Sequence, residues 1–117
     1  NMVAGRPSIL YGNGSKTRDF VYVDDVVQAC LKVMSAKAGG VFNIGNGQEI
    51  SLKEIISAIK KAAGKKFVYK VKPDRLGEVQ RSMLNSQKAK KILGWQAEVK
   101  LADGMRKTLK WAMKQES

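Results

Sequence analysis

Apolar residues recur at helical spacing in three stretches of the chain, and each stretch predicts an amphipathic helix. The first follows Asp24, a residue suited to capping a helix N-terminus. The second starts with the capping-box sequence Ser51–Glu54 and stops at Gly64, and the third spans about Leu101–Met113. A shorter helix, capped by Ser86 and running through Leu93, is expected before Gly94. The apolar stripe of the first helix is Val23, Val26, Val27, Cys30, Leu31 and Met34. The predicted inward positions are Leu52, Ile55, Ile56, Ile59 and Ala63 in the second helix, and Leu101, Met105, Thr108, Leu109 and Ala112 in the third.

Short apolar runs between these helices predict strands, and glycine-rich turns at residues 12–14 and 45–47 end two of them. The predicted strands are Ser8–Tyr11, Phe20–Val23, Val41–Ile44 and Phe67–Val71. Short strands that alternate with about four helices indicate an α/β fold of mixed α+β type. Because no linker or repeat interrupts the pattern, residues 1–117 are predicted to form one unit. Asn1–Gly5 has the pattern of the last turn of a helix, so we expect the chain to begin partway through a larger fold.

Composition limits the classes of partner and site. The chain has 22 Lys and Arg against 10 Asp and Glu, a formal net charge of +12, which attracts nucleic acid, acidic membranes and phosphorylated small molecules, although a solvated basic surface is the simpler interpretation. There is no histidine and Cys30 is the single cysteine, which excludes an intramolecular disulfide and leaves too few donors for a zinc site. We therefore expect no metal and a cytoplasmic location.

Two glycine clusters contain parts of phosphate-binding loops. Gly12–Thr17 has the residues of a Walker A loop in the wrong order, because Ser15 precedes Lys16 where a glycine is required. Residues 45–47 lie between a strand and a helix, as in a dinucleotide-binding loop, but Ile50 stands where the third glycine is needed. We interpret both clusters as turns. With no histidine and no Tyr-x-x-x-Lys pair, the sequence predicts no catalytic residues, which leaves binding as the function to consider.

Two arginines lie outside the lysine-rich helix ends. Arg18 precedes the predicted strand at 20–23, and Arg75 lies in the irregular segment 73–79. Because a guanidinium binds phosphate through two parallel hydrogen bonds, two rigidly placed arginines can hold a diphosphate. The alternative is that Arg18 pairs with Asp19 or another carboxylate while Arg75 is solvated.

Several segments occur in an order that is typical of one family. They are ILYGNGSKTRDFVYVDDVV at 9–27, VFNIGNG at 41–47 leading into ISL, RLGEV at 75–79, and KA at 88–89 followed by LGW at 93–95. This pattern resembles the extended short-chain dehydrogenase/reductase family of NAD-dependent sugar-nucleotide epimerases and dehydratases, and most closely its UDP-glucose 4-epimerase type. Compared with that pattern, Lys16 replaces a glutamine, Leu76 a proline, Glu78 an aspartate and Asn85 an aspartate.

The resemblance implies that residues 1–117 are a C-terminal, substrate-binding portion that lacks the Rossmann half. It implies no cofactor for this segment and NAD for the full-length parent, whose glycine loop and Tyr-x-x-x-Lys pair belong to the missing half. The implied substrate contacts are Arg18 and Arg75 on the nucleotide diphosphate, Glu78 on the ribose, and Ile9, Leu10 and Tyr11 along the base.

The resulting expectation is a segment that binds a nucleotide-sugar, most simply a UDP-sugar, and is inactive alone. The alternatives are a basic nucleic-acid-binding module and a free-standing structural or interaction domain with a degenerate site. Nucleic acid is the weaker alternative, because aromatic residues make up only 7% of the chain and no groove-reading helix is evident. Without a Rossmann half, apolar residues of the first helix and of 41–44 would lose their cover, so we also expect self-association, as a homo-oligomer.

Overall fold

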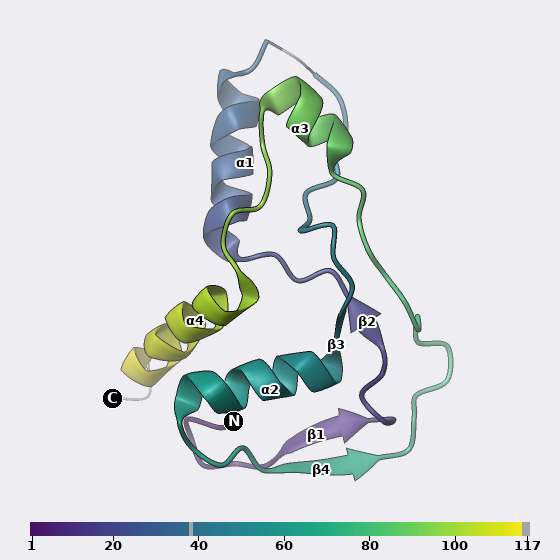
Figure 1. Cartoon of the computed structure of the whole chain (residues 1–117), viewed down its shortest axis with the longest axis vertical. Helices are drawn as coiled ribbons and strands as arrows, with labels where there is room; N and C mark the ends of the chain where they lie inside the picture. The colour runs from purple at the N-terminus through teal and green to yellow at the C-terminus, as the bar shows by residue number, and fades with distance from the viewer. Residues whose placement is uncertain (38, 116–117) are drawn as a thin grey trace.

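The computed structural model describes residues 1–37 and 39–115, which form a flat molecule with extents of 48 × 37 × 18 Å. Two helices, α1 and α3, lie together in the upper half of Figure 1, and α2, α4, β1 and β4 form the lower half. The elements in chain order are β1 (Ser8–Tyr11), β2 (Thr17–Arg18), α1 (Val23–Ser35), β3 (Ile50–Ser51), α2 (Leu52–Ala63), β4 (Tyr69–Lys72), α3 (Gln87–Leu93) and α4 (Leu101–Gln115). This mixture of four helices and short strands agrees with the predicted fold class.

Two separate strand pairs connect distant parts of the sequence. β1 and β4 run parallel, with Ser8 opposite Tyr69 and Tyr11 opposite Lys72. β2 and β3 run antiparallel, with Arg18 opposite Ile50. The loops that follow β1 and β4 therefore leave the parallel pair at the same edge.

Helix α2 forms where the sequence predicts it. The Glu54 amide donates to the Ser51 hydroxyl over 3.2 Å, and the Glu54 carboxylate accepts from the Ser51 amide over 2.7 Å, so the capping box is complete. Gly64 ends the helix with a φ of 59°, in the left-handed region that favours glycine. The predicted inner face is half-buried, and α2 packs against α4.

The upper half is built around Trp95, whose side chain is 1% exposed among Ala29 of α1 and Ala89 and Leu93 of α3. Its indole Nε1 donates to the Asp25 carbonyl over 2.8 Å. The Asp25 carboxylate accepts from the Val99 amide over 3.0 Å, so the buried start of α1 is tied to the chain that leads into α4.

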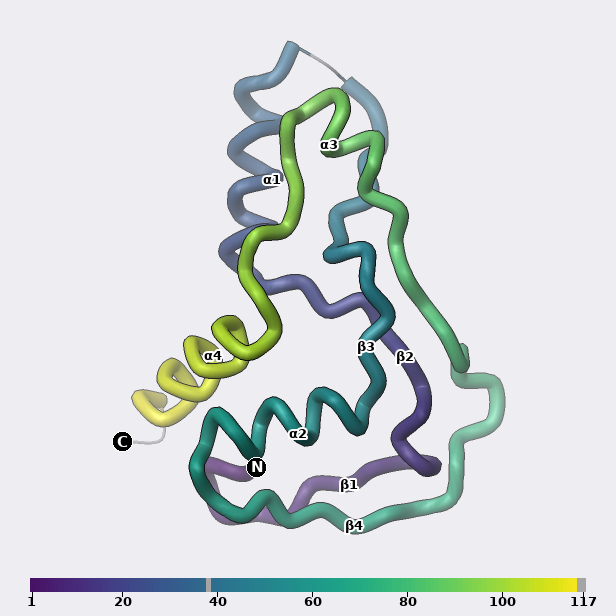
Figure 2. The backbone as a smooth tube through the Cα atoms, viewed as in Figure 1, coloured from purple at the N-terminus to yellow at the C-terminus, as the bar shows by residue number. Residues whose placement is uncertain are grey.

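The segment from residue 73 to residue 86 connects the two halves without a helix or strand. Figure 2 shows it running from β4, past β2, up to α3. The Thr17 amide donates to the Gln80 carbonyl over 3.0 Å, and the Arg81 guanidinium forms an ion pair with Glu49 at 2.6 Å. Backbone and side-chain bonds thus hold this irregular segment against the β2–β3 pair.

Two predictions at the start of α1 are wrong. Phe20–Val23 is not a strand: the pairing lies earlier, at Thr17–Arg18, and Val23 already begins the helix. Asp24 is not the N-cap, which is Tyr22 without a side-chain cap bond. The helix begins one residue before Asp24, so this carboxylate lies in the first turn, where it interacts favourably with the helix dipole.

Four further local predictions need correction. Val41–Ile44 is irregular, because no other described strand lies alongside it to share a hydrogen-bond ladder. Ser86 occupies the N-cap position of α3 but does not cap it, because its hydroxyl is bonded to the Gly45 amide and carbonyl at 3.0 and 2.9 Å. In α4, Thr108 is exposed, whereas the other predicted inward positions are half-buried. The last strand, predicted at Phe67–Val71, is Tyr69–Lys72.

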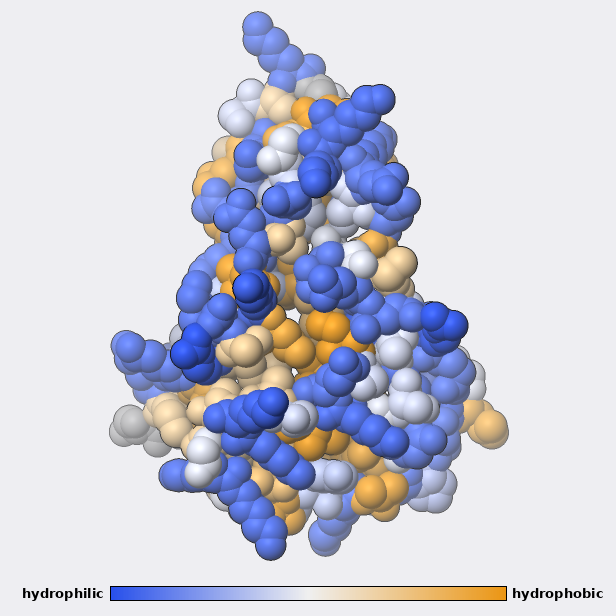
Figure 3. Space-filling model, in the orientation of Figure 1, coloured by the Kyte–Doolittle hydropathy of each residue, from blue (hydrophilic) through white to orange (hydrophobic). Residues whose placement is uncertain are grey.

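Most of the predicted apolar face of α1 is exposed to solvent. Met34 is 82% exposed, and Val23, Val27, Cys30 and Leu31 are exposed as well. In Figure 3 apolar surface gathers in the middle of the face shown, with hydrophilic side chains around it. Within the part of the chain that the structure describes, no helix is long and apolar enough to cross a membrane.

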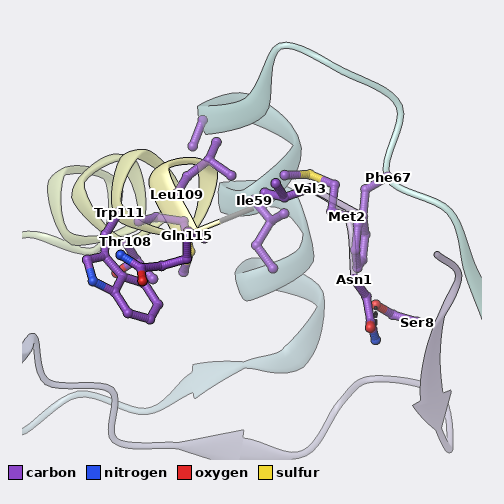
Figure 4. A pocket seen from close by; sticks show the side chains of 13 residues that line it. Asn1, Met2, Val3, Ser8, Ile59, Phe67, Thr108, Leu109, Trp111 and Gln115 are labelled. Atoms are coloured by element: carbon purple, nitrogen blue, oxygen red, sulfur yellow. Dashed lines mark hydrogen bonds between the residues drawn. The ribbon is translucent and has the colours of Figure 1, made fainter. Parts of the chain in front are cut away.

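An apolar cavity of about 510 Å³ lies between the N-terminal residues, α2 and α4 (Figure 4). Met2 and Val3 face Ile59 across it, and Leu109 and Trp111 approach from α4. No charged side chain is among the described residues that line it. The cavity can therefore take apolar groups but offers no side-chain charge to an anion.

Candidate functional site

The candidate site lies at the edge where β1 and β4 both end. After β1 the chain turns at Gly12 and Gly14, whose φ angles of 74° and 79° are in the region that favours glycine. The Gly12 amide donates to the Lys72 carbonyl over 3.0 Å, which extends the contact between the two strands into the turn. After β4 the chain enters the loop 73–80, so the residues of both connections come together at this edge.

Tyr11, the last residue of β1, stacks with Arg75 of that loop. The guanidinium carbon lies 3.7 Å from the centroid of the Tyr11 ring, which is a cation–π contact. Hydrogen bonding to Arg75, together with the charge of the guanidinium, lowers the pKa of the Tyr11 hydroxyl below its ordinary value. Arg75 is 57% exposed, so its remaining donors face solvent and are available to an anion.

Glu78 faces Arg75 from the other side of the turn at Leu76–Gly77. One carboxylate oxygen, Oε1, is 3.9 Å from the Arg75 Nη1 atom, and the other, Oε2, accepts from the Lys16 ammonium. Lys16 also donates to Asp74 Oδ1, and it lowers the pKa of the Asp74 carboxyl below its ordinary value. Two cations, Lys16 and Arg75, therefore contact two carboxylates, Asp74 and Glu78, at this edge.

A cavity of about 230 Å³ lies beside this cluster. It is lined by Ser8, Ile9, Leu10, Tyr11, Leu52, Ile55, Ile56, Phe67, Tyr69 and Glu78. Most of these side chains are apolar or aromatic, and Glu78 is the one carboxylate among them. Such a lining suits a flat, largely apolar ring with a hydroxyl-bearing group at its edge.

The structure brings together five of the six residues proposed as substrate contacts. Tyr11, Arg75 and Glu78 form the cluster, and Ile9 and Leu10 line the cavity next to it. The two differ in exposure: Leu10 is 9% exposed and Ile9 is 47% exposed.

Arg18 lies apart from the other predicted contacts, on β2. Its Nη1 donates to the Thr17 carbonyl over 2.7 Å, and among the described residues no hydrogen bond or ion pair joins it to Arg75 or Glu78. The alternative pairing of Arg18 with Asp19 is not observed either, because the Asp19 carboxylate bonds to the amides of Asn46 and Gly47.

The Asp19 carboxylate fills the glycine turn at residues 45–47. It accepts from the amides of Asn46 at 2.6 Å, Gly47 at 2.9 Å and Leu84 at 3.1 Å. This confirms that the turn is not a free phosphate loop, because the chain's own carboxylate occupies its donors. The amides of Asn46 and Gly47 are therefore not free to bind a phosphate in this structure.

Three side chains have structural roles that the sequence does not predict: Lys16 and Asp74 at this edge, and Asp19 at the turn 45–47. In the sequence Lys16 stands out only as a departure from the family pattern and Asp19 only as a partner for Arg18, and Asp74 is not among the predicted site residues. The signal for Asp74 was its place between Pro73 and Arg75; the ion pairs across 58 and 62 residues leave no local pattern. Among the described residues, no group of three or more potential ligands is placed to hold a metal ion.

Comparison with known proteins identifies the family. The profile of the family described as GDP-mannose 4,6 dehydratase matches residues 1–108, almost the whole chain. This chain belongs to that family. It is a member of the extended short-chain dehydrogenase/reductases that includes the sugar-nucleotide epimerases and dehydratases, as the sequence motifs indicated.

Curated relatives and solved structures agree with this assignment. The chain is 42% identical over 111 residues to a UDP-glucose 4-epimerase of Mycolicibacterium smegmatis, covering 94% of this chain and 36% of that protein. It is similar to the crystal structure of the Thermotoga maritima UDP-glucose 4-epimerase with UDP-glucose, with a TM-score of 0.88, 38% identity, and coverage of 99% and 38%. For the Bifidobacterium longum UDP-glucose 4-epimerase in complex with NAD+ and UDP, the TM-score is 0.89 at 31% identity, with coverage of 97% and 37%. The chain therefore spans little more than a third of the length of these relatives.

Proposed function

We propose that this chain is the C-terminal, nucleotide-sugar-binding portion of an NAD-dependent epimerase or dehydratase, and that its ligand is a UDP-sugar. The observation that carries the proposal is the contact between Tyr11 and Arg75. This contact lies next to Glu78 and the cavity of about 230 Å³ beside β1. The arrangement provides a guanidinium for phosphate, a carboxylate for ribose hydroxyls and apolar walls for a base.

Each part of the ligand finds a matching group in this arrangement. Arg75 keeps exposed donors and can bind a diphosphate while its flat face rests on Tyr11. Oε1 of Glu78 is not engaged by Lys16 and can accept from a ribose hydroxyl. Arg18 is proposed to reach the same diphosphate from β2. The relatives support the ligand class, since two are named as complexes with UDP-glucose and with UDP.

The proposal also assigns catalysis to residues outside this chain. Without the glycine loop and the Tyr-x-x-x-Lys pair, the 117 residues are expected to hold the nucleotide and to turn over no sugar alone. Binding energy from the nucleotide, which is remote from the reacting carbon, would orient the sugar in the complete enzyme.

A titration with UDP tests the binding role. Backbone amide shifts of the ¹⁵N-labelled chain are expected to change at Tyr11, Arg75 and Glu78. Arg75→Ala is expected to weaken UDP binding by about 1.5–3 kcal/mol, the contribution of a charged hydrogen bond, and Arg18→Ala by a similar amount. Arg106→Ala is the matched control, since Arg106 is 69% exposed on α4 and forms its ion pair with Asp103, three residues away on the same helix.

Other results would contradict the proposal. If the shifts were confined to lysine-rich helix ends and unchanged in Arg75→Ala, the binding would be non-specific attraction to the net charge of +12. Binding to duplex DNA that displaces UDP and falls steeply with salt would instead favour a nucleic-acid module. Turnover of UDP-glucose by the chain with added NAD would refute the assignment of catalysis elsewhere.

A further inference from the structure

Lys16 is the only basic side chain that is buried among the described residues, with 4% exposed. It follows the glycine turn after β1, and its backbone carbonyl accepts from the Leu52 amide over 3.1 Å. The turn and this bond fix the main chain, so the side chain is directed into the gap between β1 and the loop after β4.

The Lys16 ammonium bonds to two carboxylates of that loop, Asp74 and Glu78, which are 58 and 62 residues away in the sequence. Hydrogen bonds to Asp74 and Glu78 raise the pKa of Lys16 above its ordinary value, so the ammonium remains protonated. Asp74 Oδ1 also accepts from the Arg75 amide over 2.8 Å. One buried cation therefore holds the loop on both sides of Arg75.

Apart from these ion pairs and the stacking of Arg75 on Tyr11, the loop has little support near Arg75. Leu76 is fully exposed and packs against nothing, and Gly77 has a φ of 80°. A turn with glycine in this conformation at its third position is of the kind that favours proline at its second position, where Leu76 stands. Proline would fix φ at that position, and leucine does not.

We infer that Lys16 is a positioning residue for nucleotide binding, whose two ion pairs hold the Arg75 loop in place of the constraint that a proline at position 76 would supply. The inference rests on the proposed function. Lys16 also keeps both carboxylates from capturing Arg75, whose Nη1 is already 3.9 Å from Glu78 Oε1. With a neutral residue at position 16, two carboxylates face one guanidinium, and an incoming diphosphate meets a site with a net negative charge.

The test compares affinities for UDP and for uridine in Lys16→Gln, Lys16→Arg and the double variant Lys16→Gln/Leu76→Pro. Lys16→Gln is expected to weaken UDP binding about tenfold or more, and to lower the ratio of UDP to uridine affinity, because the change acts on the phosphate-binding group. Lys16→Arg keeps the charge and is expected to bind UDP within about threefold of the wild type. In the double variant, proline fixes the turn covalently, and at least about threefold of the lost affinity is expected to return.

Two controls test whether an effect of Lys16→Gln comes from the lost charge alone or from misfolding. Lys61→Gln removes the same charge from an exposed position on α2 and is expected to leave UDP affinity within about twofold of the wild type, since screening weakens distant charges. Fluorescence of the buried Trp95, measured in a Trp111→Phe background, reports whether each variant is folded. If Lys16→Gln does not fold, the comparison passes to Leu76→Pro in the wild-type background, which is expected to leave UDP affinity unchanged or raise it.

The outcomes are distinguishable. A wild-type chain that binds no UDP overturns both the proposed function and this inference. A wild type that binds UDP through Arg75, with Lys16→Gln binding equally well, overturns the inference alone. The inference is also overturned if the double variant binds UDP no more tightly than Lys16→Gln, or if Leu76→Pro alone weakens UDP binding. In either case Lys16 would not act on UDP binding by holding the Arg75 loop.

Discussion

Replacing Asp19 with alanine is expected to lower the free energy of unfolding by about 2–4 kcal/mol, because one carboxylate satisfies three backbone amides. A hydrogen bond to a charged group contributes about 1.5–3 kcal/mol when its loss leaves a donor without a partner. The Asn46 amide, with the shortest bond of 2.6 Å, is half-buried and is assigned a full contribution. Gly47 and Leu84 are exposed, so water replaces most of what their amides lose.

The assay is urea unfolding followed by Trp95 fluorescence. The measurement is made in a Trp111→Phe background, because Trp111 is 62% exposed and would add a signal that is insensitive to unfolding. Asp24→Ala is the matched control: Asp24 is 61% exposed and pairs with Lys107 at 3.6 Å, so its loss should cost less than about 1 kcal/mol. Asp19→Asn keeps one acceptor oxygen and should fall between wild type and Asp19→Ala.

Equal unfolding free energies for Asp19→Ala and Asp24→Ala, within about 0.5 kcal/mol, would refute the reasoning. The glycine turn would then be held by the Ser86 hydroxyl, which bonds to Gly45, and the carboxylate would be dispensable.

Gly45→Ala is expected to lower the free energy of unfolding by about 1–3 kcal/mol, because the added Cβ would lie 2.7 Å from Asp19 Oδ2 and 2.9 Å from Leu84 Cβ. Gly39→Ala is the control: a Cβ there meets open space, so the free energy in the same urea assay should hardly change. Ser51→Ala removes the cap of α2 and should lower the free energy of unfolding by about 0.5–2 kcal/mol. Ser57→Ala, on the exposed side of the helix, is the control, and equal effects of the two substitutions would contradict the role of the cap. Hydrogen bonds from the Ser51 hydroxyl and amide lower the pKa of Glu54 in the folded chain. The ionised carboxylate therefore adds to the free energy of unfolding at pH values above the pKa of Glu54 in the unfolded chain. This stabilisation is lost as the pH falls through the lower pKa of the folded chain. The free energy of unfolding should therefore fall more between about pH 6 and pH 3 for the wild type than for Glu54→Gln. If the two free energies fell in parallel with pH, the lowered pKa of Glu54 would not contribute to stability.

The helices were predictable because their signals are local. Ser51 and Glu54 are three residues apart, and both bonds of the capping box form within one turn, so the sequence alone specifies the start of α2. Gly64 and Gly94 end their helices with φ angles of 59° and 61°, as glycine at a helix C-terminus predicts.

The strands and the site were only partly predictable because they depend on partners far away in the sequence. Val41–Ile44 has strand-like residues but no described neighbour to pair with, whereas Thr17–Arg18 pairs with Ile50–Ser51 despite its polar composition. Arg75 and Tyr11 could be named as candidates from family motifs, but their stacking depends on the parallel pairing of β1 with β4. The role of Lys16 depends on the same pairing, so periodicity gives no sign of it.

The long sequence separation within the β1–β4 edge has a consequence for the order of folding. Lys16 meets Asp74 only when a loop of 58 residues has closed, and the entropy of such a closure is lost before any contact at the edge offsets it. Helix α2, with its cap within one turn, has no such loop to close. Contacts of long sequence separation slow folding, so the helices are expected to form first and the Arg75 loop last. During synthesis on the ribosome, β1 emerges long before β4 and remains unpaired in the interval, so competence to bind a ligand arises only at the end of the folding sequence.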